Sequence, residues 1–216
     1  MKQILFRYIF TLILIVALSS CSMTYLSIYG IKKIRFLEEK EILDYGKQYK
    51  IPFQDSYQLD TSYFSFMSNL DSDKYGSQIK NHLQPLQALY YNQEGELLSF
   101  HINCYAGGFP NLKWDRNDIF STFPPKEQAP IDRILSLADH MKFAKPMSQT
   151  ENLSIVNFDN IVIVYWSRFM GRQSKRLINY VQANERLAYD RKVKIVYINA
   201  DNIFAGENKT AAGNKK

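Results

Sequence analysis

The pattern of hydrophobic and polar positions is clearest in the last third of the chain. Two runs of β-branched and aromatic residues, 161–166 and 193–198, are apolar at nearly every position, which is typical of strands buried on both faces of a sheet. Between them, residues 172–189 place their apolar side chains on one side of a helix. A strand, a helix and a strand in this order form a βαβ unit, so we expect parallel strands with a right-handed crossover.

A β-hairpin is predicted upstream of this unit. Residues 86–91 are a candidate strand, and residues 96–104 alternate as a strand with one buried face does. Gly95 lies in the turn between them and supplies the positive backbone angle that such a turn usually needs. The alternation places Leu98, Phe100, Ile102 and Cys104 on one face.

The remaining elements have weaker patterns. We expect an amphipathic helix over 32–49 that ends before Ile51-Pro52, a short strand near 63–67, and helices around 74–82 and 131–143. Residues 105–130 are loop-like because glycines and prolines interrupt them. The polar residues 205–216 are expected to form a disordered tail.

The N-terminus has the order of charge and hydrophobicity that signal peptides have. Lys2 and Arg7 precede an apolar run over 8–18, and the small residues Ser19 and Ser20 follow it. The apolar run is too short for a comfortable membrane span, which needs about 20 residues. It therefore fits the central segment of a cleavable signal.

The end of this segment, Leu18-Ser19-Ser20-Cys21, resembles the lipobox of bacterial lipoproteins. The resemblance implies that the thiol of Cys21 is diacylated, that the chain is cut before it, and that the new amine is acylated, with fatty acids such as palmitate. Stable membrane attachment takes at least two lipid signals, which three acyl chains exceed. The alternative is an uncleaved signal anchor in which Cys21 is incidental.

This resemblance implies a domain organisation and an address. Residues 1–20 are expected to be the signal peptide, 21–30 the lipidated N-terminus and tether, and 31–204 a single α/β domain. The address is the cell envelope, with the protein on the outer membrane and facing the periplasm. Membrane lipid is then one partner, held through Cys21.

The composition narrows the classes of partner. The formal net charge is +6, but Lys and Arg are interleaved with Asp and Glu and form no long basic run, so nucleic acid is not indicated. A weak attraction to anionic lipid headgroups fits this balance. The chain has two cysteines and three histidines. With Cys21 assigned to lipid, no CxxC motif and no metal-type Cys/His spacing, we expect no intramolecular disulfide, no metal and no cofactor.

The βαβ unit is similar to the first half of a thioredoxin-like domain over about 45 of the 216 residues. Trp166 matches the first tryptophan of the active-site turn of that family, Phe169 the second aromatic residue and Gly171 the glycine. Met170 and Gln173 stand where the two cysteines would be, and Arg172 stands where proline would be. Thiol–disulfide exchange requires a thiolate, so the resemblance implies a domain that has lost redox chemistry.

The family also implies a strand hairpin after this unit, whereas here the chain ends. The hairpin at 86–104, preceded by Pro85, is a candidate for that missing piece, placed earlier in the chain. The expected fold is therefore an α/β, thioredoxin-like three-layer sandwich in permuted order, with a mixed sheet and flanking helices.

Three groups of residues are candidate sites. Arg168, Arg172, Lys175 and Arg176 lie at the start of the predicted helix, either as an anion site or as a solvated face. Tyr105, Phe109 and Trp114 form either an aromatic platform for a sugar or peptide or a loop that tucks onto the sheet. Cys104 is either a reactive thiol, with His101 and Asp115 as imagined partners, or a core residue. Strand alternation favours the core and points His101 to the opposite face.

Three functions follow from these patterns. The first is a non-enzymatic lipoprotein whose domain binds or assembles an envelope protein or a glycan. The second is an envelope enzyme of unrecognised class that uses the 105–118 loop together with the basic cluster. The third is a single-thiol redox protein that acts through Cys104.

Overall fold

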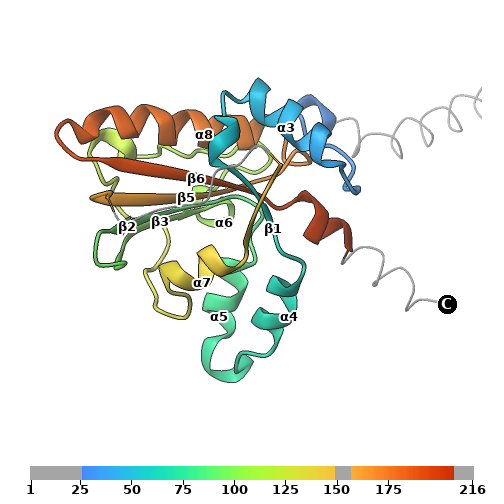
Figure 1. Ribbon diagram of the computed structural model, residues 1–216, viewed down its shortest axis with the longest axis horizontal. Helices are drawn as coiled ribbons and strands as arrows, with labels where there is room; N and C mark the ends of the chain where they lie inside the picture. The colour runs from blue at the N-terminus through green and yellow to red at the C-terminus, as the bar shows by residue number, and fades with distance from the viewer. Residues whose placement is uncertain (1–25, 149–156, 207–216) are drawn as a thin grey trace, which may run out of the picture.

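The computed structural model describes residues 26–148 and 157–206, which form one six-stranded sheet with helices on both faces (Figure 1). The strands are β1 (Ser56–Leu59), β2 (Gln87–Asn92), β3 (Leu97–Ile102), β4 (Ala144–Pro146), β5 (Asn160–Trp166) and β6 (Val193–Asn199). The α-helices are α3 (Glu39–Gln48), α4 (Ser62–Ser68), α5 (Ser72–His82), α6 (Asn103–Ala106), α7 (Leu137–Lys142) and α8 (Arg172–Glu185). Short 3₁₀ turns are η1 (Phe53–Asp55), η2 (Ile119–Ser121) and η3 (Arg186–Ala188), and residues 201–206 are also helical.

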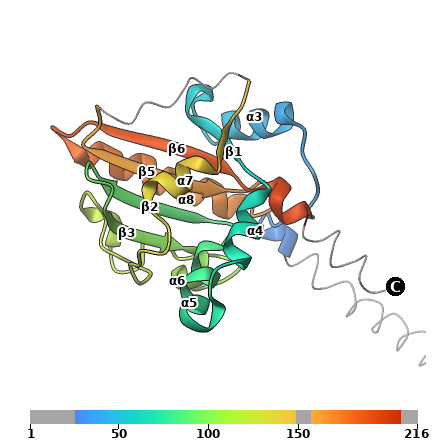
Figure 2. The same cartoon turned by 60° about the horizontal axis from the view of Figure 1, so that its bottom comes forward.

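The strand order is β3-β2-β5-β6-β1-β4. β5 and β6 are parallel neighbours with Val164 opposite Tyr197, and β1 extends the parallel part on the far side of β6. β2 runs antiparallel to β5, with Leu89 opposite Ile163, and β3 runs antiparallel to β2. Figure 2 shows β3, β2, β5 and β6 side by side.

This arrangement confirms the expected fold class. The βαβ unit β5-α8-β6 is present with parallel strands, and the earlier hairpin β2-β3 adds to β5 in the same sheet. The hairpin thus lies where a thioredoxin-like sheet needs it, although it comes first in the chain. β1 and β4 at the other side of the sheet were not predicted.

Two apolar layers hold the sheet between the helices. Every residue of β5 is buried, as expected for a strand with side chains packed on both faces. One layer, under α3 and α8, contains Trp114, Trp166 and Leu177. The other, over α4, α5 and α7, contains Tyr63 and Phe143. These are the two helical layers above and below the sheet in Figure 1.

Three predicted elements have different bounds or type. The predicted strand at 63–67 is wrong: this segment lies in α4, where Tyr63 and Met67, four residues apart, bury the same helix face. The helix predicted over 32–49 begins only at Glu39. The helix predicted over 131–143 begins at Leu137, because the Ser136 side chain accepts the amide of Asp139 in a capping box.

The ends of the domain also differ from expectation. Ala205 is buried in the helical segment 201–206, so the folded region continues beyond residue 204. The described ends of the chain, residues 26 and 206, lie at the same edge of the sheet in both views (Figures 1 and 2). Residues 1–25, with the predicted signal and Cys21, and residues 207–216 lie outside the described residues. Within the described ranges no helix is long and apolar enough to cross a bilayer.

Candidate functional site

The turn that follows β5 lies at the edge of the sheet where β5 and β6 end, and a buried carboxylate organises it. Asp201, just after β6, accepts the backbone amide of Arg168 at 2.5 Å and that of Phe169 at 3.2 Å. Asn199 also donates to it at 2.8 Å. Burial raises the pKa of Asp201, while these donors oppose the rise. The Asn-x-Asp run at the end of β6 therefore holds the turn in place.

The start of α8 closes the other side of the turn. The hydroxyl of Ser174 donates to the carbonyl of Ser167 at 2.5 Å and accepts the Ser167 amide at 3.3 Å. Together with Asp201, this contact uses the backbone amides of residues 167–169. The anion that the turn binds is therefore a carboxylate of the chain itself, which leaves these amides unavailable to an external anion.

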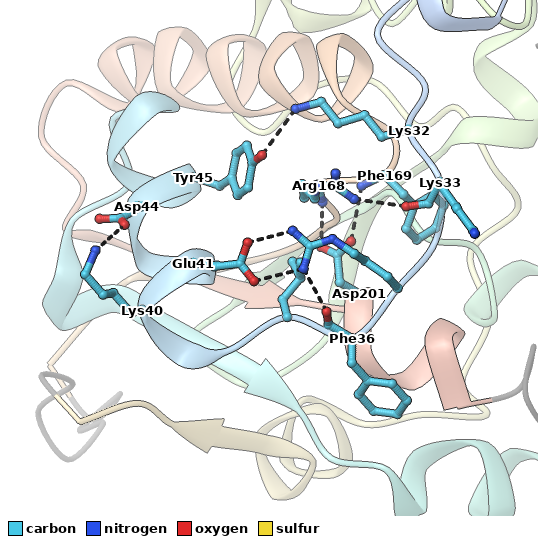
Figure 3. A network of polar contacts seen from close by, with 12 residues as sticks. Lys32, Lys33, Phe36, Lys40, Glu41, Asp44, Tyr45, Arg168, Phe169 and Asp201 are labelled. Carbon is cyan, nitrogen blue, oxygen red and sulfur yellow. Dashed lines mark hydrogen bonds and ion pairs between the residues drawn. The ribbon is translucent and has the colours of Figure 1, made fainter.

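An extended segment, residues 30–37, crosses the turn from outside, and we call it the strap (Figure 3). The amide of Lys32 donates to the carbonyl of Phe169 at 2.8 Å. Gly30 and Gly171 are in close contact, since a Cβ on Gly171 would lie 1.7 Å from the Gly30 carbonyl oxygen. At the far end of the strap, Leu37 exchanges two hydrogen bonds with the Asn202 side chain, at 2.7 and 2.9 Å.

Charged side chains fasten the strap to α3 and to the turn (Figure 3). Arg168 donates to the carbonyl of Lys33 at 2.9 Å and lies over the ring of Tyr45, 5.7 Å from its centroid. Arg35 forms a two-bond ion pair with Glu41 at 2.6 and 2.9 Å, which lowers the pKa of Glu41 to about 2. The strap, the turn and α3 thus form one connected polar surface.

The residues that match the thioredoxin-like turn are mostly inaccessible. Trp166, Phe169, Met170 and Gln173 are buried, Gly171 has a positive φ of 49°, and Arg172 is exposed. Both the burial of these residues and their side-chain chemistry argue against thiol exchange at this turn, because neither methionine nor glutamine carries an ionisable thiol.

The structure brings the 105–118 loop and the basic cluster together. The side chain of Gln173 accepts the amide of Leu112 at 3.1 Å, and Arg176 donates to the side chain of Asn111. The polar groups of the loop and of α8 therefore bind each other at these contacts. The aromatic platform is not formed as a unit, because Trp114 is fully buried whereas Tyr105 and Phe109 are exposed.

Cys104 was expected at a buried strand position, and this expectation is wrong. β3 ends at Ile102, so Cys104 lies in α6 and is exposed. Partial burial raises the pKa of its thiol, which lowers the fraction of thiolate at neutral pH. Its imagined partners have other contacts: His101 is buried with its Nε2 atom 2.8 Å from the Ser99 hydroxyl, and Asp115 accepts the amide of Phe120 at 2.9 Å.

Two histidines far apart in the sequence meet below the sheet. The rings of His82 and His140 are 5.5 Å apart. His82 lies 3.0 Å from a carboxylate oxygen of Asp132, and His140 lies 2.7 Å from the hydroxyl of Tyr165. No group of three or more His, Cys, Asp or Glu side chains in the described part of the chain has the geometry of a metal site.

A groove of about 460 Å³ lies at the opposite edge of the sheet, where β6 begins. Its lining includes the ion pair of Lys194 and Asp55, together with Glu185 and Tyr197. Burial, and then the charge of Asp55, raises the pKa of Glu185. Sequence reasoning missed these residues, because Asp55 and Lys194 are 139 positions apart and neither belongs to a motif.

Comparisons with protein-family models, with curated proteins and with solved structures found no match.

Proposed function

We propose that this protein is a membrane-anchored envelope lipoprotein whose thioredoxin-like domain is redox-inactive and serves as a binding or assembly module. One observation carries the proposal. The turn that would hold a reactive thiol pair has Met170 and Gln173 instead, and it is closed from inside by Asp201 and from outside by the strap. A site built in this way supports a structural use of the fold and no thiol exchange.

The geometry of the strap gives the proposed anchor an orientation. It leads back to Leu26, the first described residue, which lies five residues after Cys21. The contacts of Gly30 and Lys32 with the turn fix the point from which the tether leaves the domain. A lipid at Cys21 would therefore hold the edge that carries the turn toward the membrane.

The anchor is tested by comparing the two cysteines of the chain. Cells grown with a clickable palmitate analogue are expected to label the wild-type protein and the Cys104→Ser variant, and both fractionate with membranes. Cys21→Ser is expected to lose the label, because the acyl chains have no thiol to attach to. Labelling that persists in Cys21→Ser, or that is missing from the wild type, contradicts lipidation at Cys21.

The loss of redox chemistry is tested with the purified protein. Insulin reduction in the presence of dithiothreitol is expected to proceed at the rate of dithiothreitol alone, with a thioredoxin as the positive control. An accelerated rate that disappears in Cys104→Ser would favour the single-thiol alternative, since Cys104 is exposed.

A binding role is tested on the exposed aromatic residues of the loop. A photo-crosslinking residue at Phe109 is expected to trap one discrete partner in intact cells, whereas the same residue at Tyr189, also exposed but beyond α8, should not.

The enzyme alternative keeps one supporting observation, the contact of the loop with α8 through Leu112 and Gln173. It would be favoured if Arg176→Ala abolished a measured activity while leaving the fold intact.

A further inference from the structure

Cations without carboxylate partners gather at the edge of the sheet from which the tether leaves. Lys32 and Lys33 lie on the strap, Arg172 and Lys175 lie on the first turn of α8, and all four are exposed. Within the described residues, none of them lies within ion-pair distance of a carboxylate. We call these four residues the basic edge.

Three carboxylates near the basic edge already have other partners. Glu41 pairs with Arg35, Asp44 pairs with Lys40 at 2.7 Å, and Asp201 is buried on the backbone of the turn. The positive charge of the basic edge is therefore not neutralised locally. A surface of this kind attracts anions, and most strongly an anionic surface of matching extent.

The contacts of the strap bring the two halves of the basic edge together. A Cβ on Gly30 would lie 2.9 Å from the backbone nitrogen of Arg172, so the strap passes directly beside the first turn of α8. Large apolar side chains flank the cations: Ile28 is 60% exposed and Phe36 is 45% exposed. In Figure 3 the side chains of Lys33 and Phe36 point away from α3, whereas that of Lys32 reaches toward α3 and donates to the Tyr45 hydroxyl at 3.5 Å. Exposed apolar groups beside cations suit the interface between water and lipid headgroups.

The length of the tether limits how far the basic edge can lie from the bilayer. Leu26 lies five positions after Cys21, and an extended chain advances at most about 3.6 Å per residue, so the reach is about 18 Å. This distance is about two Debye lengths at physiological ionic strength. At full reach the attraction is therefore largely screened, but a less extended tether brings the edge to within one Debye length of the bilayer, about 8 Å, where the attraction acts.

We propose that the domain docks its basic edge on an anionic lipid bilayer, with the four cations on headgroup phosphates and Ile28 at the interface. This inference rests on the proposed lipid anchor and adds an orientation to it. The edge with the thioredoxin-like turn faces the membrane, and the groove that contains Lys194 and Asp55 faces away from it. Each Lys or Arg near an anionic surface contributes about fivefold to such docking, so the four contribute on the order of several hundredfold.

The test uses the lipidated protein purified from membranes and inserted into preformed vesicles of phosphatidylcholine, either pure or with one third phosphatidylglycerol. A water-soluble amine-acetylating reagent is added, and the rate at each lysine is read by mass spectrometry. Lys32, Lys33 and Lys175 are expected to react at least fivefold more slowly on the anionic vesicles than on the neutral ones. Lys142 and Lys192, on other faces, should react equally on both, and 0.5 M NaCl should remove the difference.

Charge reversal gives a matched pair of variants. Arg172→Glu with Lys175→Glu is expected to abolish the protection of Lys32 and Lys33, because like charges then face the lipid. Lys142→Glu with Lys192→Glu makes the same change in net charge elsewhere and should leave the protection intact. All four positions are exposed, and thermal unfolding of each variant checks that the fold is kept.

Two results overturn the inference. One is an equal acetylation rate of the strap lysines on neutral and anionic vesicles, and the other is protection that survives the reversal at Arg172 and Lys175. Failure of the anchor is seen separately, because a protein without lipid would not float with the neutral vesicles in a density gradient. Flotation without protection therefore refutes the docking and leaves the anchor standing.

Discussion

Replacing Asp201 by alanine tests the central contact of the candidate site. The substitution removes the acceptor of the Arg168 and Phe169 amides and leaves the donor group of Asn199 without its partner. A hydrogen bond to a charged group contributes about 1.5–3 kcal/mol, and a buried donor left unsatisfied costs about 1–3 kcal/mol. Relief of the buried carboxylate, whose pKa is raised, offsets part of this loss. We therefore expect a net destabilisation of about 3 kcal/mol.

The measurement is urea-induced unfolding followed by tryptophan fluorescence. Trp166 directly precedes the turn and is buried, so its emission reports on this region. A loss of 3 kcal/mol is a large part of a typical free energy of unfolding of about 5–15 kcal/mol. For a domain of this size it corresponds to a melting temperature lower by roughly 6–12 °C.

The matched control is Asp190→Ala, which removes an exposed carboxylate in the segment before β6 and should change the stability by less than about 0.5 kcal/mol. Asp201→Asn keeps the shape but places an amide donor against the backbone donors, so it should cost nearly as much as alanine. If Asp201→Ala lost less than about 1 kcal/mol, the carboxylate would not be what holds the turn.

Three further predictions follow from the same geometry. Gly171→Ala places a Cβ against the strap at a positive φ, so we expect the free energy of unfolding to fall by about 2 kcal/mol or more and residues 30–37 to be cleaved faster by proteases. The control is Gly76→Ala on α5, where a Cβ would meet open space, and it should be neutral or slightly stabilising. Burial lowers the pKa of His101 to about 3 and that of His140 well below its usual value. The unfolded chain takes up these protons near pH 6.5, so stability is complete above that pH and falls by about 1.4 kcal/mol per pH unit per histidine below it. Urea titrations between pH 7 and 5 measure this slope, and a flat profile would contradict the buried neutral histidines. Cys104, exposed but with a raised pKa, should react with iodoacetamide at pH 7 more slowly than free cysteine does; a faster reaction would point to an activated thiol.

Local patterns were sufficient for the elements that are apolar on both faces. The runs at 161–166 and 193–198 allow hardly any other state, and the helix between them forces a parallel pair, so β5, α8 and β6 could be predicted from the sequence. The turn at Gly95 identified the hairpin β2-β3 for the same local reason. The absence of thiols from the turn at Met170 and Gln173 could also be read directly, since it depends on residue identity.

Half-buried segments were decided by tertiary packing. Residues 32–37 carry helix-like spacing, but they are extended because Leu37 bonds to Asn202 and Lys32 bonds to Phe169. The segment with Tyr63 and Met67 fits a short strand by its sequence, but its side chains pack as a helix on the sheet. In such segments the local preference is weak, so distant partners select the conformation.

The sequence by itself determined the class of fold, the absence of a thiol pair from the turn and the expectation of a lipid anchor at Cys21. Only the tertiary structure decided how the candidate site is closed, because Asp201 meets the turn from 32 and 33 residues away. Periodicity reports which face of an element is buried. It carries no information on which distant polar group will arrive there, since that depends on the order of strands in the sheet.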